Sequence, residues 1–193
     1  MGFNYSGVME LGQTGYRFVQ SFAGNEFLDQ IMVFSAEYLL VLVPLAGLYL
    51  WFNEENGFEK ASFMGATVCL SIGLTYVFGL LYYHQPPQYQ GFETILTKDL
   101  ENAFPSQHAA GTFAAIWPAL YLGKQRVASV LTAGAVLTGI GRVYTGLHFP
   151  IDILGGVLVS LTAFAAVHLL EDYLTLSIEW LQTVTERFNL DRR

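Results

Sequence analysis

The chain has 193 residues, which suits one domain, and 53% of them are hydrophobic while only 13% are charged. The first fraction is above and the second below the values typical of soluble proteins, so the composition predicts an integral membrane protein. The net charge of −7, with nine Lys and Arg in total, argues against nucleic acid and against a polybasic lipid-binding surface, because both need clustered cations.

We expect one membrane-embedded domain over residues 1–193. Around residues 15–29 apolar and polar positions alternate and Gly24 interrupts them, so residues 1–30 are expected to form an amphipathic helix in the membrane interface. Residues 31–170 are expected to form the transmembrane core. Residues 171–193 alternate acidic and apolar positions, which predicts a second amphipathic helix at the C-terminus.

Five apolar runs in the core are each close to the roughly 20 residues that cross a bilayer. They cover residues 31–52, 61–83, 106–122, 127–140 and 151–170. The predicted fold is therefore all-α, an integral membrane bundle of about five transmembrane helices with an amphipathic helix at each end.

The basic residues divide unequally between the two sides of this five-span arrangement. One side carries Lys60, Lys124, Arg126, Arg187, Arg192 and Arg193, and the other carries Arg17, Lys98 and Arg142. Because the side richer in Lys and Arg is usually cytoplasmic, the second side is expected to face outward. We therefore predict a multi-pass protein of the plasma membrane.

Two segments on that outward side hold titratable groups at the ends of apolar runs. They are FPSQH, Phe104–His108, and GRVYTGLHFPID, Gly141–Asp152. Charge at such a place in a membrane protein indicates function.

In the first segment, Pro105 is suited to the first turn of a helix, which would place Ser106, Gln107 and His108 in that turn. Unpaired N–H groups and the helix dipole make such a turn an anion site. The alternative for Ser106 is an ordinary helix cap.

In the second segment, Pro150 marks the start of another helix and Asp152 follows His148 by four residues. This spacing allows the carboxylate to accept from one imidazole nitrogen and leave the other free as a nucleophile or base. Arg142 adds a planar fork of donors that suits phosphate. A nucleophile with its orienting acid, a second histidine, a guanidinium and a helix start together predict phosphoryl transfer.

FPSQH and GRVYTGLHFPIDILGG resemble the second and third signatures, PSxH and SRxxxxxHxxxD, of the type 2 phosphatidic acid phosphatase (PAP2) superfamily. The sequences of these motifs are most similar to those of its undecaprenyl-diphosphatase branch. The sequence resemblance extends over roughly residues 22–168. It implies a helical membrane fold of the PAP2/haloperoxidase type, with no metal and no cofactor, that acts on lipid phosphates or diphosphates at the outer face.

The resemblance also implies roles for single residues. His148 matches the nucleophile that forms a phosphohistidine, Asp152 the residue that orients it, and His108 the acid that protonates the departing oxygen. Arg142 and Ser106 match the phosphate clamp. Gln107 stands beside them where the family has Gly or Asp, and is expected to line the phosphate site. Gly141 stands where the family usually has Ser or Thr.

The family's first signature, KxxxxxxRP, is degenerate here. Phe78 or Thr75 stands at the Lys position and Gln85 at the Arg position, and residues 61–97 contain no Lys or Arg. Losing two cations should weaken electrostatic stabilisation by several kcal/mol unless other groups replace them. Lys98 and His84 are the candidate replacements.

Glu37, in the outer half of the first predicted span, has two possible interpretations. It is either a carboxylate near enough to the interface to reach water, or a partner of Arg142 or of one histidine. The small residues Gly155, Gly156 and Ser160 are expected to serve helix packing.

The predicted function is that of a lipid phosphatase that hydrolyses a polyprenyl diphosphate or related lipid phosphate through a phosphohistidine. Its expected partners are the bilayer and that substrate, without nucleic acid. One alternative is a weakened relative that binds or moves lipid phosphates without turnover. Another is a redox enzyme that uses vanadate on the same histidines.

Overall fold

The computed structural model describes residues 5–99 and 102–190, and all regular structure within them is helical. The α-helices are α1 (Tyr5–Gln20), α2 (Glu26–Tyr38), α3 (Leu42–Asn53), α4 (Gly57–Leu81), α5 (Gln107–Ala114), α6 (Ile116–Tyr121), α7 (Gln125–Tyr144), α8 (Pro150–Leu169) and α9 (Glu171–Leu190). Two short 3-10 turns, η1 (Leu39–Val41) and η2 (Pro87–Gln90), complete the set. The predicted all-α fold is confirmed.

Four helices in the described part of the chain are long and apolar enough to cross a membrane. They are Glu26–Asn53, which runs from α2 through η1 into α3, then Gly57–Leu81, Gln125–Tyr144 and Pro150–Leu169. These correspond to the first, second, fourth and fifth predicted spans, with ends that differ by a few residues. The structure therefore describes a multi-pass membrane protein.

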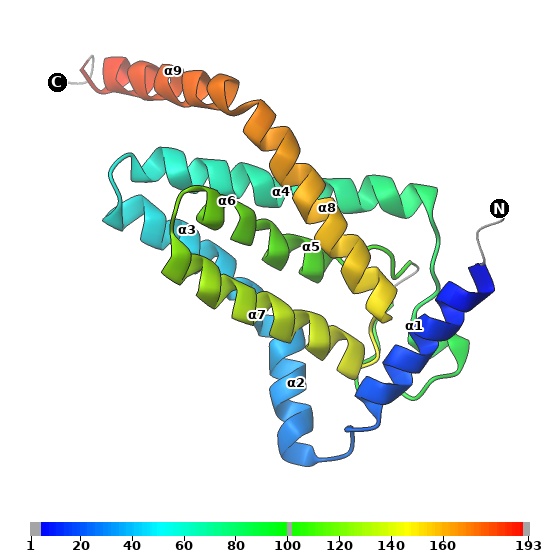
Figure 1. Ribbon diagram of the computed structural model, residues 1–193. Helices are drawn as coiled ribbons and strands as arrows, with labels where there is room; N and C mark the ends of the chain where they lie inside the picture. The colour runs from blue at the N-terminus through cyan, green and yellow to red at the C-terminus, as the bar shows by residue number, and fades with distance from the viewer. Residues whose placement is uncertain (1–4, 100–101, 191–193) are drawn as a thin grey trace.

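The third predicted span, residues 106–122, is a broken helix in the structure. It is a pair of short helices, α5 and α6, that meet at Ala115. Together they cover residues 107–121, about 22 Å of helix, which is shorter than the roughly 30 Å of a bilayer core. In Figure 1 they lie in the middle of the bundle, between α4 and α7, with α8 crossing in front.

Small side chains fit this central position. Five alanines of the pair are completely buried: Ala109, Ala110, Ala114, Ala115 and Ala119. These two helices are surrounded by protein more than by lipid, so they need close packing rather than long apolar side chains. The sequence pattern could not separate an enclosed helix pair from a lipid-facing span.

The packing of α8 on α5 depends on glycine. A Cβ atom on Gly156 would lie 2.7 Å from the Ser106 carbonyl oxygen and 2.9 Å from the Ala110 nitrogen, so only glycine allows this approach. Farther along α8, the Ser160 hydroxyl accepts a 2.9 Å hydrogen bond from the Trp117 indole. The contacts at Gly156 and Ser160 agree with the predicted packing role.

A second close approach joins α2 and α7. A Cβ atom on Gly141 would lie 2.8 Å from the Met32 carbonyl oxygen and 2.9 Å from the Ala36 nitrogen. Both neighbours are backbone atoms, so neither can rotate away. The approach brings Glu37 of α2 beside Arg142 of α7.

The N-terminal helix α1 ends before a turn at Gly24, whose φ of +101° favours glycine. Tyr16 of α1 is buried, and its ring lies 5.2 Å from that of Phe149. The Tyr144 hydroxyl, at the end of α7, donates a 2.6 Å hydrogen bond to Asp29 of α2. The interruption at Gly24 is thus where the chain turns from α1 into the first span.

The two ends of the bundle differ in chemistry. The α3–α4 loop and the α6–α7 turn lie together at one end, where Glu54 binds both Lys60 and Lys124 (Figure 1). The α7–α8 loop and the start of α5 lie at the other end.

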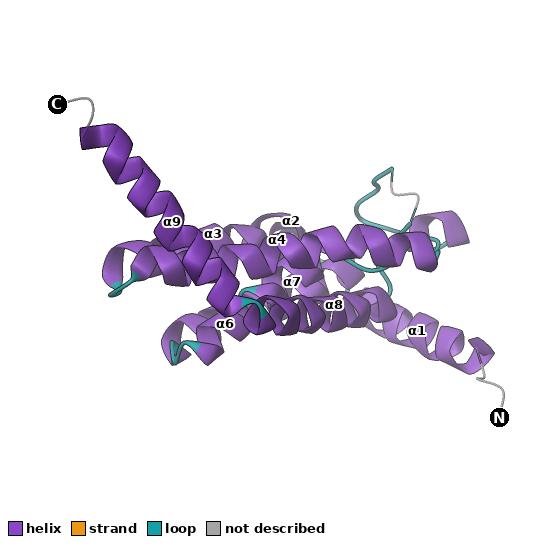
Figure 2. Ribbon diagram, turned by 90° about the horizontal axis from the view of Figure 1, so that it is seen from above, coloured by secondary structure: helices purple, strands orange, loops and turns teal. Residues whose placement is uncertain are grey.

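At the C-terminus, α9 leaves the bundle in both views (Figures 1 and 2). Arg192 and Arg193 lie outside the described residues.

Candidate active site

The two motif segments meet where α5 and α8 begin. Ser106 is the N-cap of α5, and its hydroxyl accepts a 3.4 Å hydrogen bond from the Ala109 amide. Its own amide donates to the Asp152 carbonyl at 3.0 Å. The prediction that Pro105 lies in the first helical turn is wrong, because Pro105 precedes the cap, whereas Pro150 does open α8 as predicted.

His148 lies in the short loop between α7 and α8 and is only 4% exposed. Its Nδ1 is 3.0 Å from the Ala103 carbonyl oxygen, and its Nε2 is 3.1 Å from Arg142 Nη2. A carbonyl can only accept and a guanidinium can only donate, so Nδ1 carries the proton and Nε2 presents its lone pair. This is the tautomer that a nucleophilic Nε2 needs.

Electrostatics favour the neutral form of that ring. Burial lowers the pKa of His148 below its ordinary value of 6.5, and the nearby Asp152 carboxylate only partly opposes this effect. At neutral pH, Nε2 therefore keeps its lone pair, which accepts the hydrogen bond from Arg142 Nη2.

Asp152 is completely buried at the start of α8. One carboxylate oxygen, Oδ2, accepts from the Phe149 amide at 2.8 Å and lies 3.7 Å from His148 Nδ1. The other oxygen, Oδ1, is 2.6 Å from Nδ1 of His84. The predicted pairing of Asp152 with His148 is present as a 3.7 Å contact, longer than a hydrogen bond, and the closer partner of the carboxylate is His84.

Arg142, 3% exposed, holds a carboxylate as well as the histidine. Its Nη1 donates to Glu37 Oε1 at 3.1 Å, and Lys98 Nζ lies 2.9 Å and 2.7 Å from the two oxygens of the same carboxylate. Because Oε1 is shared, the two cations are no more than about 6 Å apart. Of the alternatives for Glu37, the structure favours the partner of Arg142. Within the described residues, the buried Nε of Arg142 has no hydrogen-bond partner and remains available as a donor.

These groups line one cavity of about 600 Å³. The predicted residues in its wall are Gln107, His108, Arg142, His148 and Lys98. Ser106, Asp152 and His84 are buried behind that wall. One side of the cavity is mainly apolar and is lined by α4, through residues that include Tyr76 and Leu80, and by Tyr83 just after the helix.

The positions at which the first signature was expected differ in where they lie. Thr75 belongs to the cavity wall, while Phe78 and Gln85, both within the described residues, do not. Lys98, from the loop between α4 and α5, belongs to this wall together with Arg142. His84 does not face the cavity as a substitute cation would.

Asn102 is a site residue that sequence reasoning missed. Its side chain donates to the carbonyls of Gly79 and Tyr82 and accepts from the amides of His84 and Phe104, all at 2.8–3.0 Å. It fastens the end of α4 to the beginning of FPSQH. A single Asn in a polar loop carries no signal of such a role.

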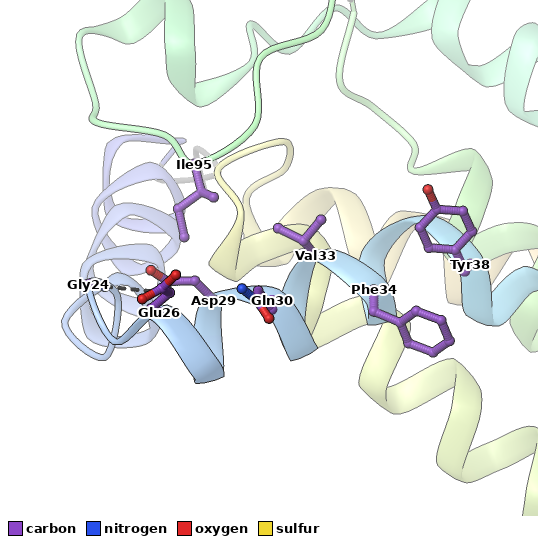
Figure 3. Close-up of a pocket in the computed structure, with 8 residues that line it drawn as sticks. All are labelled: Gly24, Glu26, Asp29, Gln30, Val33, Phe34, Tyr38 and Ile95. Atoms are coloured by element: carbon purple, nitrogen blue, oxygen red, sulfur yellow. Dashed lines mark hydrogen bonds between the residues drawn. The ribbon is translucent and has the colours of Figure 1, made fainter.

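A second hollow lies beside α2, and Figure 3 shows its lining. Val33, Phe34 and Tyr38 of α2 and Ile95 of the α4–α5 loop give it a mainly apolar wall, and Asp29 closes one end through a 3.2 Å hydrogen bond from the Gly24 amide. Its volume is about 460 Å³. Its described lining contains neither histidine nor Lys nor Arg, whereas the cavity around His148 has both histidines and cations in its wall.

Comparison with known proteins gives independent information. The family model described as PAP2 superfamily matches residues 60–176. Undecaprenyl-diphosphatase BcrC of Bacillus subtilis (strain 168) is 30% identical over 139 residues, which cover 71% of this chain and 72% of that protein.

Two solved structures share the fold. The crystal structure of Aquifex aeolicus LpxE superposes with a TM-score of 0.63 at 22% identity and covers 79% of this chain and 91% of the other. A transmembrane PAP2-type phosphatidylglycerolphosphate phosphatase from Bacillus subtilis gives a TM-score of 0.61 at 21% identity, with coverages of 88% and 89%. At these identities the likeness establishes the fold alone.

Proposed function

The chain belongs to the PAP2 superfamily, and from this we propose that it is a membrane phosphatase that hydrolyses a polyprenyl diphosphate or a related lipid phosphate at the extracytoplasmic face. The observation that carries the proposal is the pair formed by His148 Nε2 and Arg142 Nη2, 3.1 Å apart in the wall of the 600 Å³ cavity. A lone pair and a phosphate-binding guanidinium lie side by side there. The nucleophile and the charge that would hold its target are thus already in place.

The proposed reaction has two steps. His148 Nε2 attacks phosphorus, the bond to the leaving oxygen breaks, and His108 gives that oxygen a proton. Water then attacks the phosphohistidine and releases phosphate, with His108 now accepting the proton. Asp152 stabilises the positive charge that the His148 ring gains in the first step, and Ser106 orders the first turn of α5 behind Gln107 and His108.

The lipid tail has an apolar route to this cavity. Leu80 of α4 is 89% exposed, and Tyr76 and Tyr83 beside it are more than 60% exposed, although all three belong to the cavity wall. In a bilayer such side chains face acyl or isoprenoid chains. A headgroup between the histidines and Arg142 could therefore keep its tail in the lipid at α4.

Lys98 supports a diphosphate over a monophosphate. It adds a second cation within about 6 Å of Arg142, linked through Glu37 to Nη1, whereas His148 contacts Nη2. A transferred phosphoryl group would occupy the side near His148, and the second phosphate would meet Lys98. The similarity to a protein named undecaprenyl-diphosphatase agrees with this choice.

The degenerate first signature favours one other candidate, a protein that binds lipid phosphates without turnover. The test is phosphate release from a polyprenyl diphosphate by the purified protein in detergent micelles with chelator present. We expect release by the wild type and none by His148→Ala. Binding of the lipid by the wild type without any release, in low or molar salt, would establish the binding-only alternative.

A further inference from the structure

The buried carboxylate of Asp152 has a partner that the proposed reaction does not use. His84 Nδ1 lies 2.6 Å from Asp152 Oδ1, and His84 is 4% exposed while Asp152 is fully buried. An ionised carboxylate can only accept, so His84 donates through Nδ1. A hydrogen bond of this length to a buried charge is among the strong ones.

The backbone of His84 is also linked to the nucleophile, through Ala103. The Ala103 amide donates to the His84 carbonyl at 2.8 Å, and the Ala103 carbonyl accepts from His148 Nδ1 at 3.0 Å. With Asp152 Oδ2 3.7 Å from the same Nδ1, the four residues form a closed ring of contacts. His84 thus touches both groups that orient the nucleophile.

We propose that His84 is a positioning residue that fixes the Asp152 carboxylate and, through it, the tautomer and orientation of His148. This inference rests on the proposed phosphatase function. His84 holds Oδ1 in place, which leaves Oδ2 facing His148. When Nε2 bonds to phosphorus and the ring becomes positive, that oxygen is already oriented toward the charge.

The geometry argues against the simpler role of a replacement for the missing basic signature. A phosphate-binding cation must reach the cavity, and His84 lies behind the wall with Nδ1 already committed to Asp152. Its removal should therefore affect turnover rather than substrate affinity. This difference separates the two roles experimentally.

The experiment compares two substitutions. His84→Asn keeps an N–H donor near the position of Nδ1, and His84→Leu keeps bulk but removes the donor. His168 offers a matched control, since its Nδ1 makes a 3.0 Å bond to Glu171 at the exposed far end of α8. We expect His84→Leu to lower kcat about 10- to 100-fold with KM within about twofold, as when the partner of a site-orienting group is lost. His84→Asn should recover most of kcat, and His168→Leu should match the wild type.

A readout independent of turnover is the ¹⁵N spectrum of the histidine rings in purified protein. The wild type and His84→Asn should hold His148 in the Nδ1–H tautomer, and His84→Leu should show a mixture. An unchanged kcat and tautomer in a folded His84→Leu protein would overturn the proposal, and so would a change in KM alone. If the wild type released no phosphate, the proposed function would fail, and the tautomer comparison would still decide the role of His84.

Discussion

At the scale of single residues, Glu37 places a negative charge beside the two cations of the cavity wall, Lys98 and Arg142. Its carboxylate lies between Lys98 and Arg142 and contacts both. It therefore offsets part of their positive charge, and under the proposed function a substrate phosphate would compete with it for these two cations. Glu54, with Lys60 and Lys124, repeats the arrangement of one carboxylate and two cations at the opposite end of the bundle.

The role of Lys98 can be measured through substrate affinity. In Lys98→Met, Glu37 faces Arg142 alone and the second phosphate loses its cation. We expect KM for a diphosphate lipid to rise about tenfold, equivalent to about 1.4 kcal/mol, with little change in kcat. Lys60→Met removes a cation from the Glu54 cluster and should leave KM unchanged. A KM that stays constant in Lys98→Met would show that Lys98 does not replace the missing signature.

The protonation of His148 can be followed directly by an NMR pH titration of labelled histidine rings. Burial lowers the pKa of His148, so the neutral ring should persist as the pH falls to 6.5 and be lost only below that. The His148 signal is identified by its disappearance in His148→Gln. A ring more than half protonated at pH 6.5 would contradict the expected direction of the shift.

At the scale of helices, the contact of α2 with α7 decides whether Glu37 can reach Arg142. Gly141 permits that contact because a side chain there would collide with the backbone at Met32 and Ala36. The family's usual Ser at this position therefore does not fit this chain. The close approach of α2 explains why this chain has Gly141 where the family usually has Ser.

Gly141→Ser should consequently harm the protein although it restores the family pattern. We expect a loss of stability of about 1–3 kcal/mol from overpacking, seen as a lower Tm in detergent. Gly73→Ser is the control, because nothing lies within 4 Å of a Cβ at Gly73. Equal melting temperatures for Gly141→Ser and Gly73→Ser would show that α2 can move away at little cost.

The sequence predicted the helices well where hydrophobic length is decisive, and the motifs predicted which residues would lie close together where their spacing is local. Four spans followed from apolar runs, and His148, Arg142 and His108 do share one cavity. The partners of these residues could not be predicted in the same way. Lys98 meets Glu37 across 61 positions and His84 meets Asp152 across 68, and such contacts depend on how the helices and the long α4–α5 loop pack rather than on any local pattern.

At the scale of the whole molecule, chemical labelling can test the prediction that the end of the bundle with His148 faces outward. The α3–α4 loop and the α6–α7 turn, joined by the contacts of Glu54 with Lys60 and Lys124, lie at the end of the bundle opposite the α7–α8 loop (Figure 1). In a Cys69→Ser background, we expect a membrane-impermeant thiol reagent to label Gln90→Cys on intact cells and to spare Glu55→Cys until the membrane is opened. The reverse pattern would place the cavity in the cytoplasm.

The four hydrogen bonds of Asn102 affect which substitutions the α4–α5 loop can accept during evolution. They join the end of α4 and His84 to the start of FPSQH, so the two ends of the α4–α5 loop are fastened to each other. Between these ends, the amides of Ile95 and Leu96 both donate to the Thr145 carbonyl at 3.0 Å, three residues before His148. The loop is therefore held near its middle as well as at its ends. A substitution of the Lys98 side chain changes the charge that lines the cavity while these backbone anchors of the histidines stay in place.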